Sequence, residues 1–75
     1  MKTLLNILND IDDSIDWEHE SALIDDRLLD SFGVISLIPE LEDAFGIEIE
    51  AFEMTPGNFN SADSMWKMIT RLQGK

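Results

Sequence analysis

The residues best suited to chemistry are Asp30, Ser31, Phe32 and Gly33, which stand at the start of a predicted amphipathic helix ending near Phe45. Asp30 is the predicted N-cap, because its carboxylate can accept hydrogen bonds from unpaired N–H groups of the first turn. The Ser31 hydroxyl then lies beside those N–H groups and the positive end of the helix dipole. That environment favours a covalently attached phosphate.

The residues around Ser31 resemble the acyl carrier and peptidyl carrier family, in which the serine of an Asp-Ser-Leu-like motif carries 4′-phosphopantetheine. The similar segments are Leu28-Leu29-Asp30-Ser31-Phe32-Gly33 and Glu40-Leu41-Glu42-Asp43-Ala44-Phe45-Gly46-Ile47-Glu48-Ile49. The Asp-Ser-Phe-Gly variant looks closest to D-alanyl carriers and free-standing peptidyl carriers. The resemblance implies a small all-α bundle with three main helices and one short helix.

The resemblance also implies a cofactor and partners. A phosphopantetheinyl transferase would move 4′-phosphopantetheine from coenzyme A onto Ser31, and the terminal thiol of the arm would hold an acyl or aminoacyl group as a thioester. A ligase would load that group, and an acyltransferase or synthase would receive it. Asp30 would also lie near the metal ion that the transferase uses. The carrier itself is expected to catalyse nothing and to bind no metal.

Three residues near the start of the helix depart from fatty-acid carriers. Those carriers commonly have leucine where this chain has Phe32, and acidic residues where it has Gly33 and Ser36. The usual electrostatic docking pattern is therefore missing, which argues against a role in fatty acid synthesis and favours docking through apolar side chains. The docking candidates are Phe32, Val34, Ile35, Ile49 and Phe52. Core packing is the alternative for both phenylalanines.

The charge of the chain favours protein partners with basic surfaces. Sixteen acidic residues oppose five basic ones, for a net charge of −11, and Arg27 is the only base between Asp10 and Asp63. Such a field repels nucleic acids and anionic membranes. No cysteine is present, so a thiol must come with a prosthetic group, and a cytoplasmic location fits. We expect one monomeric domain over residues 1–75 with no nucleic-acid partner and no membrane insertion.

Periodicity and turn chemistry predict the other elements. Apolar residues at helical spacing indicate a first helix over about residues 2–15, followed by a long loop over 16–29 that apolar residues, Trp17 among them, pin to the core. Pro39 should kink the second helix between Ile35 and Glu40. Gly46 should end that helix as a left-handed C-cap, and its core stripe is formed by Val34, Leu37, Ile38, Leu41 and Phe45. Residues 48–53 form a short turn or a one-turn helix, residues 55–58 form a turn, and Phe59 returns to the core.

The end of the chain is predicted to be helical. Ser61 is its N-cap, and Asp63 lies in its first turn. Lys67, Arg71 and Lys75 complement the negative C-terminal end of its dipole. Trp66 is expected to be a core anchor, as is Trp17 in the loop.

Other polar residues do not form a recognisable site. An acidic run begins at Asp10, but a calcium loop starting there would have Ile15 in place of its glycine and Ser21 in place of its bidentate glutamate. His19 is the only histidine, and no cysteine accompanies it, so it is interpreted as an exposed polar residue. The chain thus lacks the groups for nucleophilic or acid–base catalysis.

The leading hypothesis is a carrier that presents acyl or aminoacyl thioesters from Ser31. D-alanine, another amino acid, a fatty acyl or short acyl group and a polyketide chain are the open alternatives for the cargo. The alternative function is an unmodified acidic interaction module, such as an inhibitor or a nucleic-acid mimic that occupies a basic groove.

Overall fold

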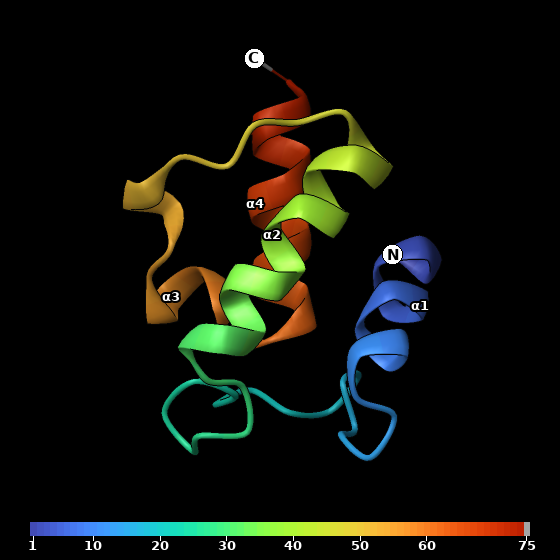
Figure 1. Cartoon of the computed structure of the whole chain (residues 1–75), viewed down its shortest axis with the longest axis vertical. Coiled ribbons are helices and arrows are strands. Elements are labelled where there is room, and N and C mark those ends of the chain that lie inside the picture. Colours follow the sequence, from blue (N-terminus) through green and yellow to red (C-terminus); the bar gives the residue numbers. More distant parts are fainter. Residues whose placement is uncertain (75) are drawn as a thin grey trace.

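The structure is a computed structural model that describes residues 1–74, with Ser31 described by its backbone alone. Its elements are α1 (Lys2–Ile11), α2 (Ser31–Phe45), the 3₁₀ turn η1 (Ala51–Glu53), α3 (Pro56–Phe59) and α4 (Ala62–Gln73). Helices α1 and α3 lie on opposite sides of α2 (Figure 1). Helix α1 packs against α2 and α4, and α3 packs against α4. Within the described residues there is no strand, and the prediction of a small all-α bundle is confirmed.

One hydrophobic core joins the helices and the long loop. The apolar face of α2 is buried at Val34, Leu37 and Leu41, as its periodicity predicts. The other core residues include Leu4, Leu8, Trp17, Leu23, Leu29, Phe59, Met65, Met68, Ile69 and Leu72. Trp66 is partly buried and meets Phe45 edge to face, with ring centroids 5.8 Å apart. Both tryptophans therefore contribute to packing, as expected.

Helix α1 ends at Ile11, four residues earlier than the periodicity predicts. Asp12 has extended backbone angles, and its Oδ1 accepts hydrogen bonds from the amide and hydroxyl of Ser14, at 2.9 and 2.5 Å. These local bonds replace the next helical turn. They also hold the pKa of the Asp12 carboxyl below its usual value. Ile15 still packs against the core, but from a turn rather than a helix.

The loop between α1 and α2 is anchored at Leu23. This side chain is fully buried, and its backbone N–H donates to the carbonyl of Asn60 at 2.8 Å. The side-chain oxygen of Asn60 accepts from the amides of Ile24 and Asp25, at 2.9 and 3.2 Å. The prediction of a loop pinned to the core is confirmed, although Leu28 within it is 43% exposed.

Helix α2 is capped at both ends as predicted. Asp30 accepts a hydrogen bond from the Gly33 amide, and Gly46 ends the helix with a φ of 61° in the left-handed region. Pro39 lies inside the helix, which continues through it. Ile35 and Pro39 are both exposed, so the Ile35 carbonyl that lacks its usual donor lies on the solvent side. The kink expected there stays a prediction.

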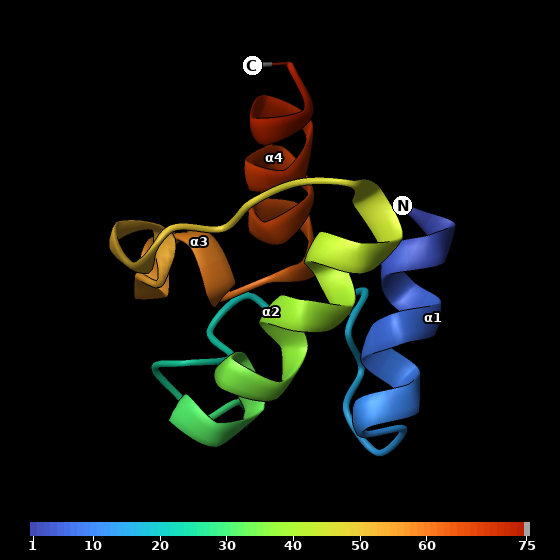
Figure 2. The same cartoon turned by 45° about the horizontal axis from the view of Figure 1, so that its top comes forward.

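The chain between α2 and α4 differs in part from its prediction. In the view of Figure 2 it crosses α4 and reaches α3 on the side away from α1. The short helical turn expected within residues 48–53 is η1, whereas the turn expected at 55–58 is a short helix, α3, with Pro56 at its first turn. Phe59 is buried, as expected. Helix α4 has Ser61 as its N-cap, as predicted, and Lys75 lies outside the described residues.

Replacing Asn60 with alanine should destabilise the protein by about 1–2 kcal/mol, because the amides of Ile24 and Asp25 would lose their side-chain acceptor. Urea unfolding followed by tryptophan fluorescence measures the loss. Asn9→Ala is the matched control, since Asn9 is exposed on α1 and should change the free energy of unfolding by less than about 0.5 kcal/mol. Equal stability of the two variants would contradict the anchoring role of Asn60.

Candidate functional site at the start of helix α2

Asp30 fixes the backbone at the start of α2. Its Oδ1 accepts a hydrogen bond from the Gly33 amide at 2.8 Å, and its carbonyl accepts from the Val34 amide at 3.0 Å. Ser31 is therefore the first residue of the helix, as predicted, although its side chain lies outside the described part of the structure. The amides of Ser31 and Phe32 have no intrahelical acceptor at this position.

Gly33 allows Leu29 to pack over the first turn of α2. A Cβ atom on residue 33 would lie 2.6 Å from Cδ1 of Leu29, whose side chain is only 4% exposed. Any side chain at this position would require the end of the Leu29 side chain to shift. Glycine at residue 33 thus allows the close packing of Leu29 that the structure shows.

A groove of about 430 Å³ lies beside the start of α2. Its first wall comes from the loop and α2: Ile24, Arg27, Leu29, Asp30, Val34 and Ile35. Its second wall comes from the chain around α3: Met54, Thr55, Pro56 and Phe59. Most of this lining is apolar, so the groove offers an apolar surface next to Ser31. The sequence did not predict it, because its walls come from segments far apart in the chain.

Arg27 contributes the basic group of the groove. It has a φ of 61°, in the left-handed region that non-glycine residues rarely adopt. The Arg27 amide donates to the carbonyl of Ile24 at 3.1 Å, and the amides of Leu28 and Leu29 both donate to the carbonyl of Leu23. These bonds turn the chain sharply before it enters α2. Nothing in the residue type of Arg27 indicates this conformation in advance.

Among curated proteins, the chain is similar to aminoacyl carrier protein 2 of Bradyrhizobium diazoefficiens. The two are 38% identical over 61 residues, which cover 81% of this chain and 67% of the relative. The chain belongs to the acyl carrier protein family. No family model and no solved structure matches it.

This acyl carrier exposes large apolar side chains in the first turns of α2 and on η1. Phe32 is 80% exposed, Ile35 is 57% exposed and Phe52 on η1 is 69% exposed. Core packing is therefore excluded for both phenylalanines, and their role in docking stays a prediction. Val34 and Ile49 are 7% and 8% exposed. Both side chains pack in the core, so the proposed docking surface does not depend on them.

Glu53 is a buried acid of the carrier that sequence reasoning missed. Its side chain is only 5% exposed and forms an ion pair with Arg71 of α4. Hydrogen bonding to Glu53 raises the pKa of Arg71 above its usual value, so the guanidinium stays charged. Arg71 lies in the last turn of α4, as expected, but it also joins that helix to η1. The sequence contains no signal for this pair, because the partners are far apart in the chain.

His19 and Asp16 of the carrier are not part of the groove lining. His19 is exposed, and its Nδ1 lies 2.8 Å from an Asp16 oxygen, an ion pair only when His19 is protonated. Within residues 1–74, no three acidic or histidine side chains gather where they could hold a metal ion. No helix among these residues has the length and apolar character needed to cross a membrane.

Proposed function

We propose that Ser31 carries a 4′-phosphopantetheine arm and that the protein presents acyl or aminoacyl thioesters on this arm to partner enzymes. The observation that carries the proposal is that a member of the acyl carrier protein family has Asp30-Ser31 at a capped helix start. The relative is named as an aminoacyl carrier, which favours an amino acid as the cargo. Family membership also argues against the alternative of an unmodified acidic module.

The residues at the start of α2 fit such an arm. The Asp30 carboxylate accepts the hydrogen bond of the Gly33 amide. The amides of Ser31 and Phe32 have no acceptor within the helix, so they can donate to a phosphate or to water. Asp30 and Phe32 are both exposed, which leaves room for a transferase to approach. The groove beside them has an apolar lining along which an arm can lie.

The chemistry of loading is divided between this chain and its partners. A transferase would join the Ser31 oxygen to the phosphorus that bears pantetheine, while the bond from that phosphorus to the nucleotide half of coenzyme A breaks. When bound, the arm supplies the thiol that a ligase acylates and from which an acyltransferase or synthase takes the group. This chain orients the arm and docks these enzymes, as a monomer in the cytoplasm.

Intact mass spectrometry tests the attachment site. After incubation with coenzyme A, magnesium and a broad-specificity phosphopantetheinyl transferase, the wild type should gain the mass of one phosphopantetheine. Ser31→Ala should gain none, because it lacks the accepting hydroxyl. No gain in a folded wild type, shown by its circular dichroism, would overturn the carrier proposal.

We also propose that Asp30 contributes to modification beyond its capping role. Asp30→Asn keeps a good N-cap and should change stability by only a few tenths of a kcal/mol, but it removes a charge next to Ser31. Its rate of phosphopantetheine transfer should fall about tenfold or more, an interaction difference of about 1.4 kcal/mol or more. Thermal unfolding provides the control. A wild-type transfer rate in Asp30→Asn would show that Asp30 acts only as a helix cap.

Docking through apolar side chains is the third part of the proposal. The exposed candidates are Phe32, Ile35 and Phe52, and no acid lies between Ser31 and Pro39. Phe32→Ser should raise the transferase KM for the carrier about tenfold, because a buried aromatic anchor is worth about 1–2 kcal/mol at an interface. Leu28→Ser, at another exposed apolar residue, is the control. An unchanged KM for Phe32→Ser would remove this residue from the docking surface.

A further inference from the structure

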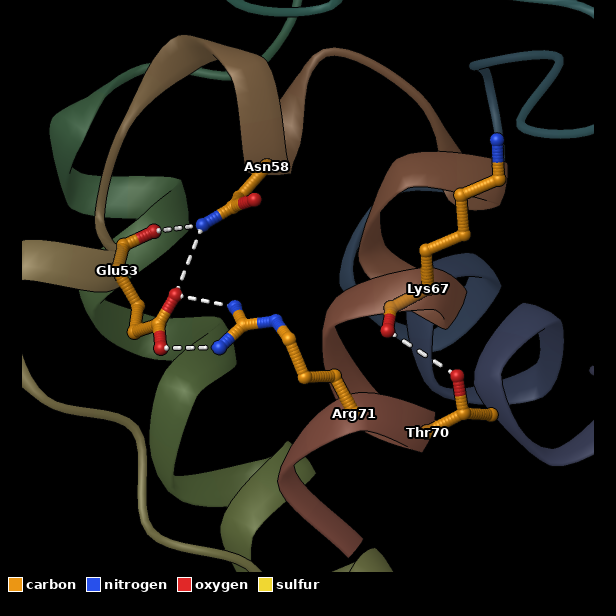
Figure 3. Close-up of polar contacts among 5 residues, drawn as sticks. All are labelled: Glu53, Asn58, Lys67, Thr70 and Arg71. Carbon is orange, nitrogen blue, oxygen red and sulfur yellow. Dashed lines mark hydrogen bonds and ion pairs between the residues drawn. The ribbon is translucent and has the colours of Figure 1, made fainter. Parts of the chain in front are cut away.

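Glu53, Asn58 and Arg71 form a polar cluster that we call the Glu53 clasp (Figure 3). The two oxygens of the Glu53 carboxylate accept from Nη1 and Nη2 of Arg71, at 3.0 and 2.5 Å. The side-chain nitrogen of Asn58 donates to the carbonyl of Glu53 at 2.8 Å and to its carboxylate at 3.2 Å. The clasp therefore joins η1, α3 and α4.

The clasp is a strong attachment for a short segment. A buried carboxylate is costly unless it is paired and hydrogen-bonded, and a guanidinium meets both oxygens with a fixed planar geometry. Glu53 is 4% exposed and has this pairing. The 3₁₀ turn and α3 are both too short to be stable alone, so their position depends on such attachments and on the buried Phe59.

Glu53 is also the chain neighbour of two exposed apolar residues. Glu53 stands between Phe52, which is 69% exposed, and Met54, which is 39% exposed. Met54 lines the groove beside Ser31, and so does Pro56 at the start of α3. The second wall of the groove is therefore attached to α4, while the first wall belongs to the loop and α2.

We propose that Glu53 and Arg71 are positioning residues that hold residues 51–59 as the second side of the docking surface. With the clasp closed, Met54 is held in the wall of the groove that faces Ile35 of α2, so an apolar recess on a partner enzyme can contact both walls at once. With the clasp broken, residues 51–59 move while the α1–α2–α4 core stays folded. This inference rests on the proposed carrier function.

The test compares Arg71→Gln and Glu53→Gln with Lys67→Gln. Lys67 lies on the same helix as Arg71, and its side chain points away from Glu53, so Lys67→Gln makes the same charge change without touching the clasp (Figure 3). The measurements are amide hydrogen exchange along the chain and the KM and kcat of a broad-specificity phosphopantetheinyl transferase with coenzyme A. Arg71→Lys is a fourth variant that keeps the charge but not the two-pronged contact.

Arg71→Gln and Glu53→Gln should accelerate exchange in residues 51–59 by about tenfold or more, while α1 and α2 keep wild-type exchange. The transferase KM for the carrier should rise about fivefold with kcat within about twofold, because docking weakens and the chemistry at Ser31 does not change. Arg71→Lys should be intermediate, and Lys67→Gln should match the wild type.

Equal acceleration in all helices would show a merely structural role and overturn the proposal. So would unchanged exchange in residues 51–59, an unchanged KM, or an equal effect of Lys67→Gln. A wild type that gains no phosphopantetheine would overturn the carrier function and the docking role together. The exchange pattern of the unmodified protein would then still show whether the clasp holds residues 51–59.

Discussion

Leu23 and Asn60 join the loop before α2 to the end of α3, and the positions of Asp30 and of the groove depend on this junction. Residues 12–30 form no helix or strand, yet their path determines where Asp30 lies. The buried side chain of Leu23 anchors this loop in the core. Asn60 accepts from the loop amides through its own carbonyl and its side chain. The Leu23 carbonyl in turn accepts from the amides of Leu28 and Leu29, immediately before α2. A short chain of hydrogen bonds thus leads from Asn60 to the N-cap.

Asn60 also connects the two walls of the groove. Asn60 is the C-cap residue of α3, where its amide donates to the carbonyl of Pro56, and Pro56 lines the second wall. The loop that Asn60 holds carries Ile24 and Arg27 of the first wall. The groove is therefore defined where loop and α3 meet, and α2 supplies only part of it. This arrangement explains how a small bundle with short elements keeps an apolar surface open next to Ser31.

Local patterns predicted the features that depend on local chemistry. The Asp30 cap, the Gly46 cap and the buried stripe of α2 follow from residue type and spacing, and the structure has all of them. The end of α1 was predicted wrongly, because Ile15 continues the apolar period while Asp12 bonds to Ser14 and stops the helix. Here a side-chain bond over two residues outweighs a periodic pattern.

Features that depend on distant partners could not be predicted. The burial of Glu53 requires Arg71, and the left-handed turn at Arg27 requires the fixed carbonyls of Leu23 and Ile24. The exposure of Phe32 and the burial of Val34 depend on how α2 rests on the core, so the docking candidates could be separated only with the fold in hand. The sequence thus located the candidate site, and the tertiary contacts decided its surface.

The attachment of α3 to α4 has a consequence for how such carriers recombine. A chimera that took only the loop and α2 from this protein, and the rest from another carrier, would acquire Asp30, Ser31 and one wall of the groove. The position of the other wall would still be set by the last helix of the other carrier. Because Glu53 is hydrogen-bonded to Arg71, transfer of both walls of the groove requires the middle and the C-terminal parts of the chain together. The smallest segment that transfers the whole surface therefore runs from the loop through Arg71, which is most of the domain.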